Sequence, residues 1–345
     1  MEVIRYGENM LIGSLLMGFL LVFYYIGIGS AVSNRMEYFK SYTINLSIYI
    51  YLGLGLSTIF ESFYFKKFGG LYYERIQLIL IFISLYGLYK LNGKKLIEYF
   101  LKYYAYIILV ILISCMLMDN SVNMLTEGIF YRPFQELIFY KGANELVSHD
   151  FYNQFSGADT YFPVITIIVS KIIVTGFFDV LEAGLLLRVF PILLFSIMML
   201  STMELLGIDK NKKLILILLC ASQYDKYFLV NNNIAFYGSM LLLSMAIYFN
   251  KNTIISTSQL LRVISIFILI VILYKSMFFM DLGALAVALF SLIIIYYLSS
   301  TPITLLSVVG LLVLQLHRAS IVFILAAVGI TTLYIFFNKK NNNAI

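Results

Sequence analysis

The sequence predicts an all-α, polytopic integral membrane protein: a single transmembrane domain over residues 1–345 with about eleven membrane-spanning helices, within a range of 10–12. Hydrophobic residues make up 61% of the chain and charged residues only 12%, about half the share of roughly 25% that is typical of soluble domains. A soluble fold cannot bury this much apolar surface, because its surface-to-volume ratio leaves too much exposed. We therefore expect most of the chain to lie in lipid.

Apolar runs along the chain give the individual helices, since a helix needs roughly 20 apolar residues to cross the hydrocarbon core. The predicted spans are residues 10–29, 42–60, 75–90, 103–118, 184–205, 213–230, 234–249, 263–280, 282–299, 303–316 and 319–337. Glu2, Arg5 and Glu8 precede the first run. They do not form the basic segment of a signal peptide, so the first run is predicted to be a membrane helix.

Charged loops between the runs predict the orientation. Residues 90–102 hold four lysines and one glutamate, whereas residues 119–160 hold six acidic side chains and two basic ones. Because basic loops are retained in the cytoplasm, 90–102 is placed inside and the acidic segment outside. An extracytoplasmic loop over 119–183 is thus inserted between the fourth and fifth spans. Lys66 and Lys67 fall outside in this topology and are exceptions to the rule.

Residues 161–178 are apolar but contain Lys171 in their middle. A lysine at the centre of a spanning helix costs about 2.5–3.5 kcal/mol on insertion scales. We therefore expect 161–178 to form an interfacial or re-entrant helix on the outer face rather than a span.

Cysteine and histidine usage excludes several kinds of site. Cys115 and Cys220 both lie in apolar runs, without the spacing of a disulfide framework or a metal-binding pair. His149 and His317 are the only histidines, which excludes a histidine-rich metal centre. We expect no cofactor, although acidic side chains of the outer loop could bind a divalent ion. No basic patch interleaved with aromatic residues points to nucleic acid.

His317 and Arg318 interrupt the long apolar run from Ile303 to Phe337. The run is too long for one helix across about 30 Å of hydrocarbon, so two helices could meet at this pair at the outer interface. Alternatively, one helix buries the pair near the midplane. Histidine can transfer a proton near neutral pH, and arginine binds phosphate oxygens in a bidentate manner. The alternative is a loop whose side chains reach the lipid headgroups.

Four polar clusters from distant parts of the sequence are predicted to converge on the outer face. They are residues 148–159, 224–233, 274–281 and 316–320. The first contains Asp150 and Asp159, which are suited to a general base or a divalent ion. The others supply potential sugar-binding and phosphate-binding groups, or they form ordinary solvated loops and helix ends. Those side chains are Tyr224, Asp225, Asn232, Asn233 and Lys275, with Arg132 as a weaker phosphate ligand.

The chain lacks a P-loop, a GxSxG element, an HExxH element and a GxGxxG context. It therefore lacks the signature of a nucleotide-driven motor or a familiar hydrolase. The free energy for its activity must come from the substrate or from an ion gradient.

Several motifs between residues 148 and 337 resemble a known family. Asp150-Phe151-Tyr152 precedes YFPVITIIVSKIIVTGF, then a span, a lysine-rich turn and NNNIAFYGSMLLLSMAIYFNK, and a further span leads to YKSMFF. This order resembles the EpsG-like and Wzy-type polymerases of bacterial O-antigen, capsule and exopolysaccharide. His317-Arg318-Ala319-Ser320 is similar to the H-R-S-A element of that family.

Residues 161–250 also resemble the broader GT-C glycosyltransferases, in Tyr161-Phe162-Pro163 and in a second outer acid at Asp225. Those enzymes use polyprenyl-phosphate sugars. Their first large outer loop usually follows the first helix, whereas here it follows the fourth predicted span.

The polymerase resemblance implies a glycosyltransferase of the bacterial inner membrane that acts on its outer face. It would transfer a growing glycan from undecaprenyl pyrophosphate to another lipid-linked repeat unit, with a chain-length regulator as a partner. Arg318, with Lys275, would hold the pyrophosphate, and His317 or Asp150 would deprotonate the acceptor hydroxyl. Two alternatives stay open: a GT-C-type transferase that adds one sugar, and a flippase or other transporter of lipid-linked glycans.

Overall fold

The computed structural model describes five helical segments, residues 2–33, 41–68, 73–91, 93–117 and 189–208. It also describes residues 168, 171, 172, 238, 240–245, 247, 248, 329 and 333. The helices are α1 (Glu2–Val32), α2 (Tyr42–Phe68), α3 (Tyr73–Lys90), α4 (Gly93–Leu117) and α10 (Val189–Leu205). The described residues are all-helical, without a strand among them, which confirms the predicted helical class for this part of the chain.

The helices coincide with the first five predicted apolar runs. The runs 10–29, 42–60 and 75–90 lie within α1, α2 and α3, and α10 ends at Leu205 as predicted. The main difference is α4, which begins at Gly93 instead of 103. The later predicted spans lie outside the described residues, apart from helical positions at 238, 240–245, 247, 248, 329 and 333.

Helix ends follow local signals in the sequence. Ser41 precedes α2, and its hydroxyl accepts a hydrogen bond from the Ile44 amide at 3.5 Å, as at a serine N-cap. Gly207 has a φ of 70° and ends α10. The Ile208 amide donates to the Met203 carbonyl at 2.9 Å and the Gly207 amide to the Glu204 carbonyl at 3.1 Å. These two bonds form a Schellman motif, which glycine adopts without strain.

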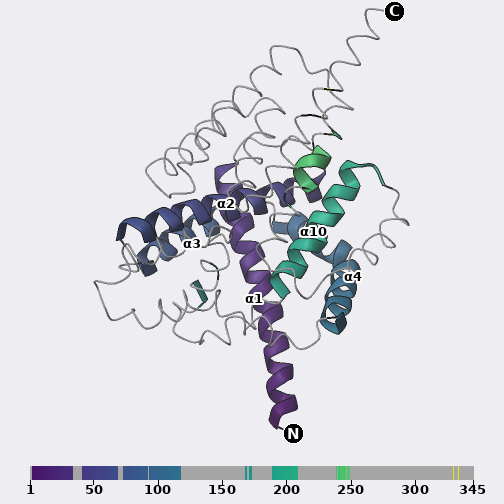
Figure 1. The fold of residues 1–345 in the computed structure, drawn as a ribbon, viewed down its shortest axis with the longest axis horizontal. Helices are drawn as coiled ribbons and strands as arrows, with labels where there is room; N and C mark the ends of the chain where they lie inside the picture. Colours follow the sequence, from purple (N-terminus) through teal and green to yellow (C-terminus); the bar gives the residue numbers. More distant parts are fainter. Residues whose placement is uncertain are drawn as a thin grey trace, which may run out of the picture.

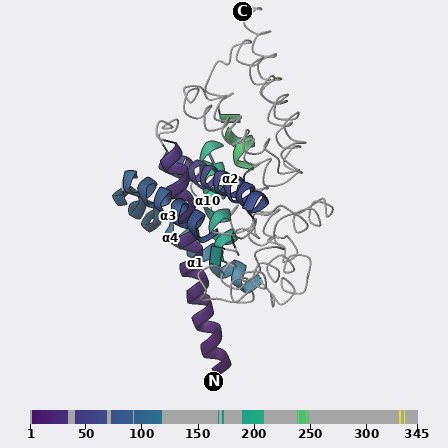
Figure 2. The same cartoon turned by 90° about the vertical axis from the view of Figure 1, so that its left-hand side faces the viewer.

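Helices α2 and α3 cross α1 at a steep angle near its C-terminal end, and the N-terminal part of α1 projects beyond them (Figures 1 and 2). Glycines allow these crossings. A Cβ atom on Gly53 of α2 would collide with the Tyr25 carbonyl of α1, and one on Gly87 of α3 would collide with the Gly27 carbonyl. Small residues at crossings let helix backbones approach closely, so α2 and α3 lie across α1 rather than alongside it.

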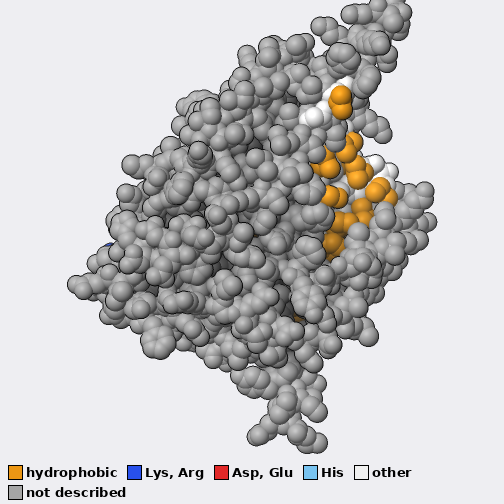
Figure 3. Space-filling model, viewed as in Figure 1, with side chains coloured by type: hydrophobic (Ala, Val, Ile, Leu, Met, Phe, Trp, Pro, Cys, Tyr) orange, Lys and Arg blue, Asp and Glu red, His pale blue; other side chains and the backbone are white. Residues whose placement is uncertain are grey.

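Small polar side chains are buried within the apolar core, and large apolar side chains are exposed. Many small polar groups are buried, including Ser47, Ser57, Thr58 and Ser201, whereas large apolar groups such as Leu16 and Phe82 are exposed. The described side chains visible in Figure 3 are mainly hydrophobic and lie on the side of α10. Exposed apolar surface of this extent is typical of a membrane or protein interface.

One described helix, over Ile12–Val32 of α1, is long and apolar enough by itself to cross a membrane. Arg75–Lys90 and Gly93–Tyr104 pass the same test only together, as a pair bent by 87°. This bent pair has the length and composition of a broken span or of a re-entrant segment. The number of membrane crossings stays a prediction.

Candidate functional site: a buried ion pair between α2 and Lys171

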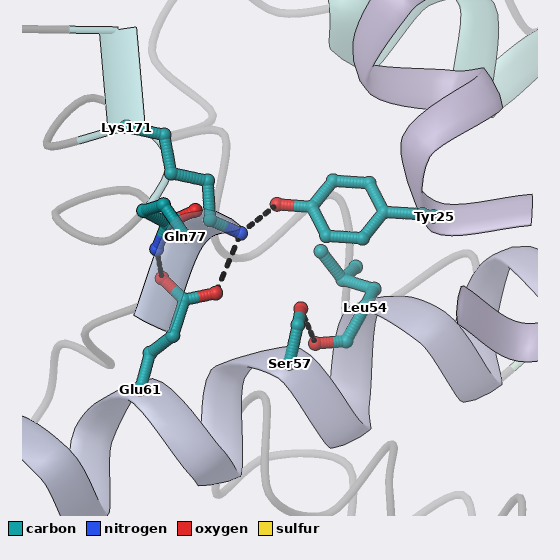
Figure 4. A network of polar contacts seen from close by, with 6 residues as sticks. All are labelled: Tyr25, Leu54, Ser57, Glu61, Gln77 and Lys171. Atoms are coloured by element: carbon teal, nitrogen blue, oxygen red, sulfur yellow. Dashed lines mark hydrogen bonds and ion pairs between the residues drawn. The ribbon is translucent and has the colours of Figure 1, made fainter. Parts of the chain in front are cut away.

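The described helices enclose a buried pair of opposite charges. Glu61 of α2 is fully buried, and its carboxylate lies 2.8 Å from the Lys171 ammonium, whose side chain is 8% exposed. Figure 4 shows the Lys171 nitrogen between the Glu61 carboxylate and the Tyr25 hydroxyl. Charges at such depth are costly unless they are paired and hydrogen-bonded, so the surroundings of both groups decide whether the site is stable.

Neighbouring groups complete the environment of both charges. Gln77 of α3 donates its side-chain amide to the second Glu61 oxygen at 2.9 Å. The Lys171 ammonium donates to the Tyr25 hydroxyl at 3.1 Å. It also lies 4.7 Å from the Tyr24 ring centroid and 4.8 Å from that of Tyr25. Aromatic faces attract a cation most strongly where water is excluded.

The local sequence explains why Glu61 faces inward. Gly53, Ser57 and Glu61 are spaced four residues apart on α2, so they lie on one face of the helix. That face is set against α1, because Gly53 contacts the Tyr25 backbone. The Ser57 hydroxyl donates to the Leu54 carbonyl of its own helix at 3.2 Å, which satisfies a buried polar group.

The Lys171 contacts bear on the predicted topology. The insertion cost assigned to 161–178 assumed a lysine without a partner, whereas Lys171 pairs with Glu61. Ile168 and Ile172 are also buried. The charge of Lys171 is therefore no argument against a position of this residue deep among the helices. The interfacial or re-entrant helix over 161–178 stays a prediction.

The predicted catalytic and substrate-binding residues lie outside the described residues. The structure thus brings none of them together and separates none of them. They are Arg132, Asp150, Asp159, Tyr224, Asp225, Asn232, Asn233, Lys275, His317 and Arg318. Within the part of the chain that is described, no group of three His, Cys, Asp or Glu side chains could hold a metal ion.

Sequence reasoning did not single out Glu61 or Gln77. The signal that could have found the site is a pair of opposite charges next to or within separate apolar runs: Glu61 directly follows the run 42–60, and Lys171 lies within 161–178. Ionisable residues in membrane helices usually pair with one another and often mark an ion, proton or substrate pathway.

Comparisons with known proteins place no constraint on this site: no protein-family model, curated protein or solved structure matches the chain. Its interpretation therefore depends on its own contacts. A buried ion pair can hold Lys171, with the buried Ile168 and Ile172, against the N-terminal helices, or it can be part of a charged pathway through them.

Proposed function

We propose that this protein is a multi-pass polymerase of lipid-linked glycan repeat units in the bacterial inner membrane. The observation that carries the proposal is the order of motifs over 148–337, which ends in His317-Arg318-Ala319-Ser320. The helical fold and the exposed apolar faces of α1, α3 and α4 support a membrane location. The chain contains no recognised nucleotide-binding motif, which agrees with a lipid-linked glycan as the activated donor.

The proposed reaction transfers a glycan between two lipid carriers. The acceptor hydroxyl attacks the anomeric carbon of the donor, a glycosidic bond forms, and the bond from that carbon to pyrophosphate breaks. His317 or Asp150 takes the hydroxyl proton, while Arg318 and Lys275 stabilise the departing undecaprenyl pyrophosphate. Asp159, Tyr224, Asp225, Asn232 and Asn233 would bind sugars.

The test is the length of the surface glycan in a deletion strain complemented with wild type, with His317→Ala or with His149→Ala. His149 is the only other histidine of the chain and has no assigned role, so its variant is the matched control. Membrane expression of each protein is measured alongside. We expect a single repeat unit in the deletion strain, and a full ladder with wild type and with His149→Ala. We expect no ladder with His317→Ala.

Other outcomes select the alternatives. A full ladder of altered sugar composition in the deletion strain would replace the polymerase with a transferase that adds one sugar. A full ladder with His317→Ala would remove that residue from the mechanism.

A transporter of lipid-linked glycans is the second candidate function, because the buried Glu61–Lys171 pair resembles the paired charges of transport pathways. Loss of a flippase would leave the repeat unit on the cytoplasmic face. The deletion strain would then carry no repeat unit at the surface, whereas loss of a polymerase leaves one.

A further inference from the structure

Helix α3 ends at Lys90 and α4 begins at Gly93, and we call these two helices with the sharp bend between them the elbow. The axes of its two arms lie at 87° to each other. Each arm exposes an apolar stripe whose members are spaced four, three and four residues apart. The stripes are Leu78, Phe82, Leu85 and Tyr89 on α3, and Ile97, Leu101, Tyr104 and Ile108 on α4. Such spacing keeps one helix face continuous.

Basic side chains surround the elbow. Lys90, Lys94, Lys95 and Lys102 are exposed, and Glu98 is the one exposed acidic side chain among them. On α4 the helical period places Lys94 beside the apolar stripe, and Lys102 and Lys95 lie farther round the same side of the helix, with Glu98 between Lys94 and Lys102. The elbow therefore combines an exposed apolar surface with an excess of positive charge beside it.

The other side of α4 packs against protein. Leu96 and Tyr99 are buried, and the Tyr99 ring lies 6.0 Å from that of Tyr42 at the start of α2. The Phe100 ring lies 5.8 Å from Phe19 of α1. These aromatic contacts set the orientation of α4. The exposed stripe and its lysines thus face away from the other described helices.

Two of the lysines rest on tyrosine rings of the same arms. The Lys90 ammonium lies 4.4 Å from the Tyr86 ring centroid, and the Lys102 ammonium lies 5.2 Å from that of Tyr103. Lysine side chains at a membrane interface typically lay their aliphatic part along aromatic and apolar surface and keep the ammonium group at the edge of that surface. Tyrosine is also enriched at that depth.

We infer that the elbow is a binding surface for anionic phospholipid headgroups of the leaflet on its side of the membrane. The lysines match the negative headgroups, and the apolar stripes match the acyl chains beneath them. A partner helix or a second copy of the chain would have to bury the same lysines, which are almost never fully buried without a partner. The inference is independent of the proposed transfer reaction.

The chain has no tryptophan, which allows a direct test. Tyr89, which is 87% exposed, is replaced by Tyr89→Trp to give a single fluorophore beside Lys90. The full-length protein is reconstituted into phosphatidylcholine vesicles that contain brominated phosphatidylglycerol or, at the same mole fraction, brominated phosphatidylcholine. The ratio of quenching by the two lipids reports the preference of the elbow for a negative headgroup.

We expect stronger quenching by brominated phosphatidylglycerol. Replacing Lys90, Lys94 and Lys95 by glutamine should reduce the preference, by up to about fivefold for each lysine. Glu98→Gln is the matched control with the opposite sign, because removing the negative charge should increase the preference. A misfolded elbow would not respond in opposite directions to these two changes, and high salt should weaken the preference.

Equal quenching by both lipids in the protein with all its lysines would overturn the inference, since the elbow would then be an ordinary lipid-facing surface. Absence of quenching by either lipid would also overturn it, because a protein partner or a second copy would then cover the stripes.

Discussion

Helices α2 and α3 both cross α1, yet their surroundings differ. Every residue of α2 from Thr43 to Thr58 is buried, whereas α3 exposes large apolar side chains around most of its circumference. The polar groups follow the protein contacts: Glu61 is buried in α2, and Gln77 and Ser84 lie on the buried edge of α3. In these two helices the buried surfaces combine apolar and polar side chains, whereas the exposed surface of α3 is mainly apolar, as is typical of a membrane or protein interface.

The largest effect is expected from breaking the buried ion pair that Glu61 of α2 forms with Lys171. Lys171→Met should destabilise the protein by about 3–5 kcal/mol, because it leaves the Glu61 carboxylate buried without its countercharge. Thermal unfolding of the purified protein in detergent measures the loss.

A matched double variant separates charge from packing. Glu61→Gln added to Lys171→Met should recover much of the loss, since no unpaired charge is left. Additive losses in the double variant would contradict the role of the pair and would point to packing of the two side chains instead.

The second test applies one chemical change to both helices. Leu54 of α2 is fully buried and Leu78 of α3 is 55% exposed. Leu54→Ala should cost about 2–5 kcal/mol because it leaves a cavity, whereas Leu78→Ala opens none and should cost far less. Chemical denaturation of the two variants gives the difference. Equal losses would show that α3 is packed against protein over its exposed face.

The third test concerns the crossing of α1 and α2. Gly53→Ala should destabilise the protein by about 1–3 kcal/mol, because the new methyl group meets the Tyr25 backbone. Gly93 at the start of α4 has nothing within 4 Å of its Cβ position. Gly93→Ala is therefore the control, and it should be neutral or stabilising by up to about 1 kcal/mol. A neutral Gly53→Ala would rule out this close crossing.

The smallest expected effect lies between α2 and α10. The hydroxyls of Ser47 and Ser201 form a hydrogen bond, and Ser201 also donates to the Thr43 carbonyl at 3.1 Å. Hydrogen bonds between membrane helices average about 0.6 kcal/mol in mutant cycles. A double-mutant cycle of Ser47→Ala and Ser201→Ala should give a coupling energy of that size. A coupling energy of zero would contradict the hydrogen bond between α2 and α10.

The sequence predicted helix positions better than helix arrangement. The runs 10–29, 42–60 and 75–90 are helical in the structure, as their length and apolar composition predicted. The start of α4 was missed, since Lys94 and Lys95 were assigned to a loop although lysine is a good helix former. The end of α10 was predicted correctly, and Gly207 supplies the physical reason.

Prediction of the candidate site was less complete. In the sequence, Lys171 stood out only for the free-energy cost of inserting it into a membrane. The role of Glu61 follows only from its contact with Lys171 in the structure. Pairing between residues so far apart in the chain depends on how the helices cross, and helical periodicity contains no information on that. The residues expected to act on a lipid-linked glycan, with His317 and Arg318 foremost, stay predictions.

Composition and the length of its apolar runs predicted the helical class that the described residues show, and they favour a membrane location, because both properties are sums over local residues. The tertiary structure alone decided which charges are neutralised. Glu61 becomes a partner of Lys171 where α2 packs against α1 at Gly53, whereas the lysines of the elbow stay exposed because α4 packs its other side against α1 and α2.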